Sequence, residues 1–113
     1  MDASSWWKEL PGAVTVCGRD GVILEMNERA RRTFEADGGA ALIGTNVLDC
    51  HPEPARTKLR DLLASGRVHV YTIEKKGIKK LIYQAPWFEA GVYAGFVELS
   101  LEIPTAMPHF IRG

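Results

Sequence analysis

Alternating apolar residues mark the first structured part of the chain. The stretch "AVTVCGRDGVILEMN" contains two short β-rich runs around Asp20 and Gly21, a pair that favours the tight turn of a β-hairpin. Asn27 then predicts the start of a helix, because its side chain can accept a hydrogen bond from a free backbone N–H. The glycine pair at 38–39 is expected to end this helix. The apolar residues spaced to share one helical face are Met26, Ala30 and Phe34.

Helical spacing governs the middle of the chain. The stretch "ALIGTNVLD" has no long period and predicts short helical turns. A longer helix is expected from about Pro54, since proline is tolerated in a first helical turn, and Gly66 should end it. Its charged face is interpreted as solvated rather than phosphate-binding. The apolar residues of this helix recur at i, i+4, i+7 and i+8 and are Ala55, Leu59, Leu62 and Leu63.

Residues 68–103 return to a β pattern. They are rich in β-branched and aromatic residues, with turns expected at 76–77 and 89–91, and so predict three antiparallel strands. Because an isolated hairpin is marginally stable, the first two strands should join these three. The fold class expected is α+β: a five-stranded antiparallel sheet with short helices packed over one face. Residues 1–10 are expected to form an N-terminal helical segment, 11–103 the folded domain and 104–113 an irregular tail.

Composition narrows the classes of function. A chain of 113 residues fits one domain, and its 14 basic and 14 acidic residues cancel, which disfavours a nucleic-acid partner. The first residues lack the features of a signal peptide, and no apolar run is long enough to cross a membrane, so a cytoplasmic protein is expected. Cys17 and Cys50 are expected to be free thiols. No triad, nucleophile elbow or glycine-rich phosphate loop is present, so an enzyme is not expected.

Three stretches, in order and with their spacing, resemble a PAS domain, a small sensor module of bacterial signalling proteins. They are "LPGAVTVCGRDGVILEMNERARRTF", "LIGTNVLDCHP" and "GVYAGFVELSLEI", and the resemblance spans roughly Leu10 to Ile103. Within the family, the pieces around "DCHP" and the last two strands look closest to a subgroup that often occurs as short stand-alone proteins. The resemblance implies a five-stranded sheet whose inner face and helices enclose a cleft, where some members hold haem, flavin or a small metabolite.

The residues do not determine which cofactor, if any, the protein binds. The family's flavin photosensors resemble a pattern with cysteine inside Asn-Cys-Arg-Phe-Leu-Gln, which is absent here, so flavin is not expected. The family's haem sensors usually carry an axial histidine within the helix that here begins near Pro54, and that helix has none; His51 lies just before it. A haem or metal sensor centred on His51 is therefore an alternative that we do not favour.

The adjacent Cys50 and His51 are the first candidate site. Imidazole and thiolate are both good metal donors. The interpretation that we favour is structural, with Cys50 filling an apolar gap and His51 bonding to the backbone at the helix start. Cys17 is interpreted as a packing residue.

Period-two alternation supplies the other candidates. It groups Leu81, Tyr83, Ala85 and Trp87 on one face and Val97, Leu99 and Leu101 on another strand's face, and both groups are expected to line the inside. Tyr83 and Gln84 have polar ends that could orient a ligand. For a domain of this size, the interpretation that we favour over a preformed cofactor pocket is that the aromatic residues simply fill the core. The candidate ligand-binding residues are therefore Cys50, His51, Leu81, Tyr83, Gln84, Val97 and Leu99.

Two consecutive tryptophans, Trp6 and Trp7, cannot both face the same way in a helix, so one needs a second surface or stays exposed. Either they form a homodimer interface, together with Phe96, or they cover the domain's own sheet.

The function expected is a non-catalytic PAS sensory domain that binds a small molecule or a protein partner and signals through rearrangement of a dimer, acting on a separate output protein. A purely structural dimerisation module is a further alternative.

Overall fold

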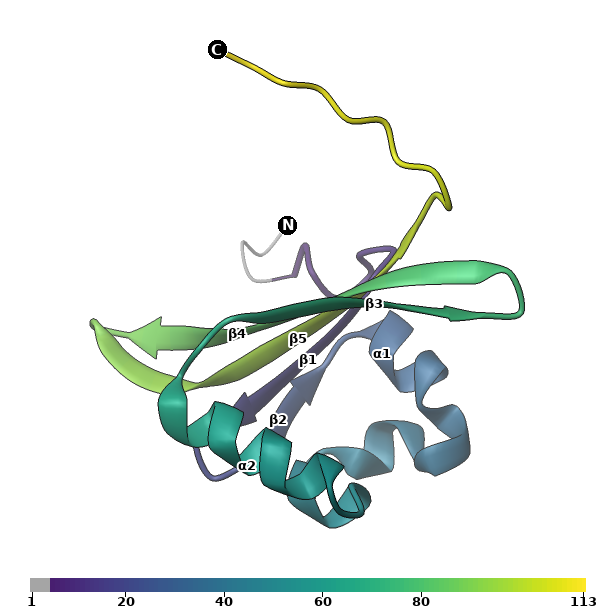
Figure 1. Ribbon diagram of the computed structural model, residues 1–113. Coiled ribbons are helices and arrows are strands. Elements are labelled where there is room, and N and C mark those ends of the chain that lie inside the picture. The colour runs from purple at the N-terminus through teal and green to yellow at the C-terminus, as the bar shows by residue number, and fades with distance from the viewer. Residues whose placement is uncertain (1–4) are drawn as a thin grey trace.

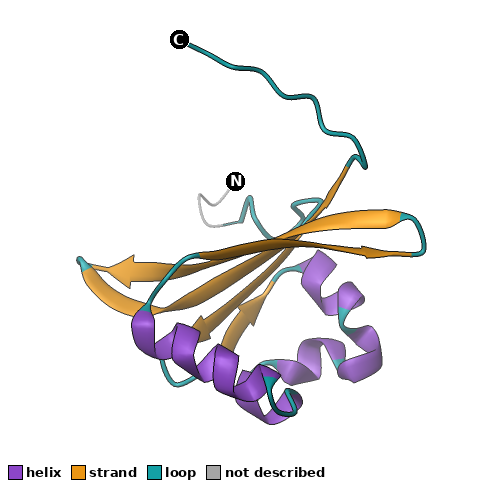
Figure 2. Cartoon of the chain, in the orientation of Figure 1, coloured by secondary structure: helices purple, strands orange, loops and turns teal. Residues whose placement is uncertain are grey.

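A computed structural model describes residues 5–113 and shows a sheet covered on one face by helices (Figures 1 and 2). The strands are β1 (Ala13–Gly18), β2 (Ile23–Met26), β3 (His69–Lys75), β4 (Ile78–Glu89) and β5 (Val92–Ile103). The α-helices are α1 (Glu28–Thr33) and α2 (Ala55–Ser65), and three 3₁₀ turns are η1 (Glu35–Asp37), η2 (Gly39–Leu42) and η3 (Val47–Cys50). These elements confirm the predicted α+β class.

The five strands form one antiparallel sheet in the order β2-β1-β5-β4-β3. The first and last strands are therefore neighbours, with Val14 opposite Leu99 and Cys17 opposite Phe96. Two-residue turns join the last three strands. Ala90 and Gly91 both have positive φ, 50° and 80°, as the type I′ hairpin turn requires.

All helices lie on one face of the sheet, with α1 and the 3₁₀ turns toward one end and α2 toward the other (Figure 1). The segment before β1 lies on the opposite face, and residues 104–113 extend away from the sheet without helix or strand. The described part of the N-terminal segment, residues 5–10, forms turns rather than the expected helix, with Leu10 N–H donating to the Trp7 oxygen. Residues 1–4 lie outside the described part.

Asn27 joins the N-terminal segment, β1 and α1. Its side chain is 1% exposed, and its Oδ1 accepts from the backbone N–H groups of Val14 and Ala30, at 2.9 and 3.0 Å. Its Nδ2 donates to the backbone oxygens of Trp7 and Gly12, at 3.0 and 2.8 Å. The predicted helix cap is confirmed, and the same amide also fixes the chain on the far side of the sheet.

The helix α2 ends as the sequence predicts, at Gly66, whose left-handed conformation lets its N–H donate to the Leu62 oxygen. Leu63 is buried and packs in a cluster with Cys17 and Phe96. The Tyr93 hydroxyl donates to the Leu63 oxygen at 2.6 Å, which ties α2 to β5. A second cluster forms around Ala13, Ile23, Met26 and Ala30, with Phe34 packed against it.

Candidate functional site

A cavity of about 520 Å³ lies between the inner face of the sheet and the helical layer. Its size is in the range of small-molecule binding pockets. Its apolar wall on the sheet side consists of Cys17, Ile23, Met26, Phe96 and Val97, and its apolar wall on the helical side consists of Phe34, Leu42, Val47, Leu59 and Leu63.

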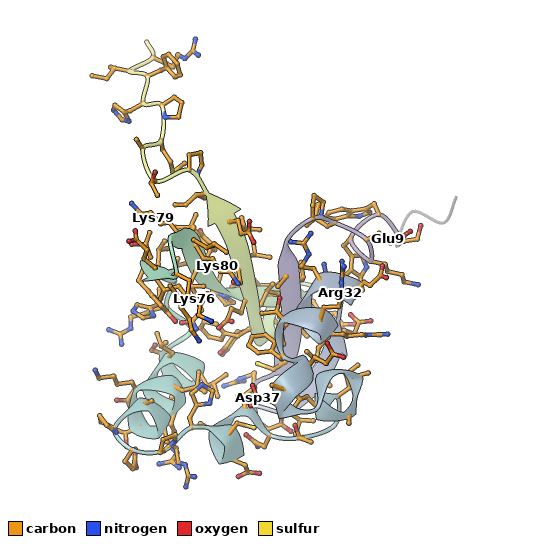
Figure 3. All side chains as sticks on the ribbon, turned by 90° about the vertical axis from the view of Figure 1, so that its right-hand side faces the viewer. Glu9, Arg32, Asp37, Lys76, Lys79 and Lys80 are labelled. Atoms are coloured by element: carbon orange, nitrogen blue, oxygen red, sulfur yellow. The ribbon has the colours of Figure 1, made fainter. Side chains whose placement is uncertain are left out.

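Polar groups are few and come from five parts of the chain. The polar lining residues are Thr15, Asp37, Cys50, His51, Gln84 and Glu98. Three neighbouring strands contribute the floor, because Gln84 on β4 lies opposite Glu98 on β5, which in turn lies opposite Thr15 on β1. Asp37 lies on the helical side at η1, and Figure 3 shows it well separated from the lysines that gather on the β3–β4 hairpin.

A chain of hydrogen bonds crosses this floor. Gln84 Nε2 donates to Glu98 Oε2 at 2.8 Å, and Gln84 Oε1 pairs with His69 Nδ1 at 3.0 Å. An amide oxygen can only accept, so His69 Nδ1 carries the proton in this contact. The chain therefore runs from His69 through Gln84 to Glu98 with a fixed direction of donation.

The cavity-lining strands do not face as the sequence alternation predicted. Since directly opposed residues share a face, Tyr83 and Leu99, which oppose each other, lie on the face away from Gln84 and Glu98. Leu81, opposite Leu101, lies on that outer face as well. The prediction that these residues line the inside is wrong: the apolar side of these strands is the outer one. Val97 shares the register of the outer face yet borders the cavity.

Phe96 is also placed differently from the prediction. It was expected at a dimer interface, but it is only 7% exposed, packs with Cys17 and Leu63, and lines the cavity. Its ring meets Tyr93 edge to face, with centroids 6.1 Å apart. Phe96 therefore belongs to the core. Trp6, in contrast, is 66% exposed, and Trp7 is half-buried.

Cys50 and His51 both border the cavity and are exposed. His51 Nδ1 lies 2.6 Å from the Val47 oxygen, the backbone contact expected for it. Because a carbonyl only accepts, Nδ1 carries a proton, and Nε2 of the neutral ring is left as an acceptor. Cys50 does not fill an apolar gap, since its side chain is exposed.

Of the two cysteines, Cys17 and Cys50, only Cys17 is buried. Burial is the main cause that raises its pKa, and the charges of Asp20 and Glu98 raise it further, while a backbone hydrogen bond to Phe96 acts in the opposite direction. A raised pKa disfavours the thiolate, which is the reactive form. The geometry thus gives Cys17 a packing role at the cavity floor.

Three of the polar lining residues, Thr15, Asp37 and Glu98, are not among the sequence candidates. Glu98 had a signal in the sequence, because it stands in the middle of the otherwise apolar run "GFVELSLEI". A carboxylate at the centre of a sheet points to a wet or functional surface, since burying a charge in a packed core is costly. Asp37 had no such signal, as its position depends on how η1 folds back over the sheet.

Residues 5–113 contain neither a cluster of metal ligands nor a membrane-spanning helix. No three His, Cys, Asp or Glu side chains in this range gather closely enough to hold a metal ion. No helix in the same range combines the length and the apolar character needed to cross a bilayer.

The sequence model of one family, described as the PAS fold, matches residues 7–77. This match covers more than half of the chain, and so the protein belongs to the PAS-fold family. The five-stranded order and the one-sided helical layer agree with that assignment. A comparison with curated proteins finds no significant match.

Solved structures share the fold at low sequence identity. The Aer2 receptor of Vibrio cholerae, a dual PAS-haem oxygen sensor, is similar with a TM-score of 0.66 at 15% identity, over 82% of this chain and 95% of that one. A PAS domain of an HTR-like protein from Haloarcula marismortui has a TM-score of 0.63 at 14% identity, over 88% of each chain. VqmA bound to DPO has a TM-score of 0.63 at 15% identity, over 88% of this chain and 56% of that one.

Proposed function

We propose that this PAS domain is a sensor that binds a small molecule between its sheet and its helices and passes the change to a partner, without catalysis of its own. The cavity of about 520 Å³ carries the proposal. Its apolar walls and few converging polar groups are the usual composition of a ligand pocket. A core that was simply filled by side chains would leave no such space.

The similar structures support a ligand but do not identify one. Aer2 is a haem oxygen sensor, and VqmA was solved with DPO bound. Two such different ligands on one fold mean that the ligand of this chain must be inferred from its own residues.

The candidate groups lack the activation that a catalytic nucleophile needs. The raised pKa of Cys17 keeps this thiol protonated, and the His51 nitrogen nearest to the backbone is occupied by the Val47 oxygen. Neither residue is hydrogen-bonded to a partner that would activate it as a nucleophile.

A cavity-filling variant tests ligand binding. Thr15→Phe places a large ring at the cavity floor, whereas Val16→Phe adds the same ring one residue along the strand, on the other face. Native mass spectrometry of the purified chain and thermal shift with a small-molecule library should show a ligand for the wild type and for Val16→Phe, and none for Thr15→Phe. The same result for all three proteins would contradict the proposal and favour a purely structural module.

We further propose that the outer face of the sheet forms a homodimer, with Trp6 as an anchor. Trp6 is exposed, and the same face carries the exposed Tyr83 and Val70, which lie opposite each other on β4 and β3. Exposed aromatic residues of this kind dominate many interfaces. The residues that were predicted as ligand contacts, Leu81, Tyr83 and Leu99, are thus better placed for a partner chain.

Sedimentation tests the dimer. Trp6→Ala and Tyr83→Ala should each shift the chain toward monomer, while Phe88→Ala, which removes an exposed ring near the β4–β5 turn, should not. A wild-type chain that sediments as a monomer at about 100 µM, a concentration at which micromolar dimers are populated, would contradict this part of the proposal.

One observation favours haem as a second candidate. Because Nδ1 of His51 donates to the Val47 oxygen, Nε2 is free to coordinate a haem iron at the cavity border, as the second nitrogen of axial histidines often does. The described lining contains no Lys or Arg to pair with the propionates. A stoichiometric Soret band that disappears in His51→Ala would establish this candidate, and an unchanged weak band would reject it.

A further inference from the structure

The polar atoms around the cavity are mostly acceptors. Glu98 and Asp37 contribute carboxylates, and in its neutral form the His51 ring, with Nδ1 on the Val47 oxygen, contributes an acceptor nitrogen. Gln84 donates one amide N–H to Glu98, and its amide oxygen accepts from His69. A ligand that donates hydrogen bonds would satisfy more of these atoms than one that accepts them.

Both carboxylates face the cavity without a compensating cation. Neither Glu98 nor Asp37 forms an ion pair with any residue in 5–113, and no Lys or Arg of that range lines the cavity. The charge of Glu98 is felt by its surroundings, since after the larger effect of burial it raises the pKa of both Cys17 and Tyr71. The cavity therefore has a negative potential.

The basic residues of this region lie elsewhere. Lys76, Lys79 and Lys80 gather on the β3–β4 hairpin (Figure 3), and Lys80 is four residues along β4 from Gln84. At about 3.3 Å per residue, that spacing places the Lys80 backbone roughly 13 Å from the floor of the cavity. None of these lysines lines the cavity or forms an ion pair with Glu98 or Asp37, and salt weakens interactions between charges at about this distance.

We propose, as an extension of the small-molecule sensor proposed above, that the cavity selects an organic cation: a compact apolar body that carries a protonated amine. The apolar walls would cover the body, and the ammonium group would donate to Glu98, which already accepts from Gln84 through one oxygen and has a second available. Asp37, on the helical side, would attract the cation through its charge. Anionic ligands would meet uncompensated repulsion.

Three probes of equal size but different charge test this selection by calorimetry on the full chain. They are 3-phenylpropan-1-ammonium, 3-phenylpropan-1-ol and 3-phenylpropanoate. The ammonium probe should bind about tenfold or more tightly than the other two, the usual effect of a charge-assisted hydrogen bond.

Matched variants locate the charge that is responsible. Glu98→Gln keeps the shape and can still accept from Gln84, and it should weaken binding of the ammonium probe about tenfold. Glu102→Gln removes the same charge from the same strand outside the cavity and should change binding less than about twofold. Asp37→Asn, at an exposed position that does not threaten folding, should weaken binding about twofold to fivefold.

The outcomes separate this inference from the proposed function. If the alcohol or the carboxylate binds as tightly as the ammonium probe, or if Glu98→Gln and Glu102→Gln behave alike, cation selection is wrong while the small-molecule sensor stands. If no probe binds at millimolar concentration and no molecule co-purifies with the chain, both are wrong.

Discussion

The indole Nε1 of Trp87 donates a hydrogen bond to the backbone oxygen of Cys17 at 3.0 Å, across the whole width of β5. Gly95 on β5 lies opposite Trp87, and a Cβ at this glycine would overlap the Cys17 oxygen and crowd the indole nitrogen. Only glycine lets the indole reach from β4 to β1. The contact links β4 to the backbone of Cys17, a residue of the cavity floor.

Gly95→Ala should therefore lower the free energy of unfolding by about 2–4 kcal/mol, the effect of forcing an atom into a packed site. Trp87→Phe keeps a ring but loses the donor, and should cost about 1–2 kcal/mol. Urea titrations followed by circular dichroism measure both. Losses below about 0.5 kcal/mol at both positions would show that the indole contact contributes nothing.

Asn27→Ala removes a fully buried amide with four backbone partners and should cost about 3 kcal/mol or more. Asn27→Asp tests the two halves of the amide separately. Aspartate can still cap α1 but cannot donate to the Trp7 and Gly12 oxygens, so it should also destabilise strongly. If Asp is tolerated at this position in thermal melts, helix capping alone explains the residue and the link to the N-terminal segment is unimportant.

Tyr93→Phe deletes the hydroxyl that donates to the Leu63 oxygen and should cost about 1 kcal/mol. Tyr71→Phe is the matched control, because its hydroxyl makes no hydrogen bond with any residue in 5–113. Chemical denaturation should show a loss only for Tyr93→Phe. Amide hydrogen exchange in α2 should rise in the same variant, since the bond anchors this helix to β5. Equal losses in both variants would contradict this role.

Alkaline pH should destabilise the protein. Burial is the main cause that raises the pKa of Cys17, Tyr71 and Tyr93. A group with a higher pKa in the folded state contributes stability that is complete below its unfolded pKa and is lost as the pH rises through the folded value. The free energy of unfolding should thus fall above about pH 9, where thiols and phenols titrate.

Urea titrations between about pH 7 and pH 10.5 measure this fall, a window that spans the thiol and phenol ranges. Cys17→Ala removes one of the three groups and should make the fall shallower, while Cys50→Ala, at an exposed thiol, should leave its slope unchanged. Stability that stays flat or increases across this range would refute the argument.

Local patterns in the sequence were enough to predict most of the fold. The hairpin turn at Gly21, the cap at Asn27 and the end of α2 at Gly66 each depend on one residue with a distinct conformational preference. The five-stranded sheet followed from the order of these elements and from the resemblance to PAS domains. These features are local, and so they are visible in a single sequence.

The facing of β4 and β5 could not be predicted in the same way. Alternation shows that Tyr83 and Leu99 share a face, but it does not show which face the helices cover. The usual rule predicts that the apolar face is the inner one. In this fold the inner face borders a cavity and carries Gln84 and Glu98 beside Phe96, whereas Leu81, Tyr83 and Leu99 lie on the outer face. On these two strands, the alternating apolar residues therefore mark the outer face of the sheet and not the inner one.

The neighbouring positions of β1 and β5 also determine how the domain responds to force. Ala13, at the start of β1, lies opposite Ser100, near the end of β5, so both ends of the folded domain leave from the same place in the sheet. Tension applied through residues 12 and 104 would load these strands in the unzipping geometry, in which their hydrogen bonds break one at a time. In the shear geometry, all of these hydrogen bonds would bear the load together. A pull transmitted through the flanking segments would open the centre of the sheet first and leave the β3–β4 hairpin intact.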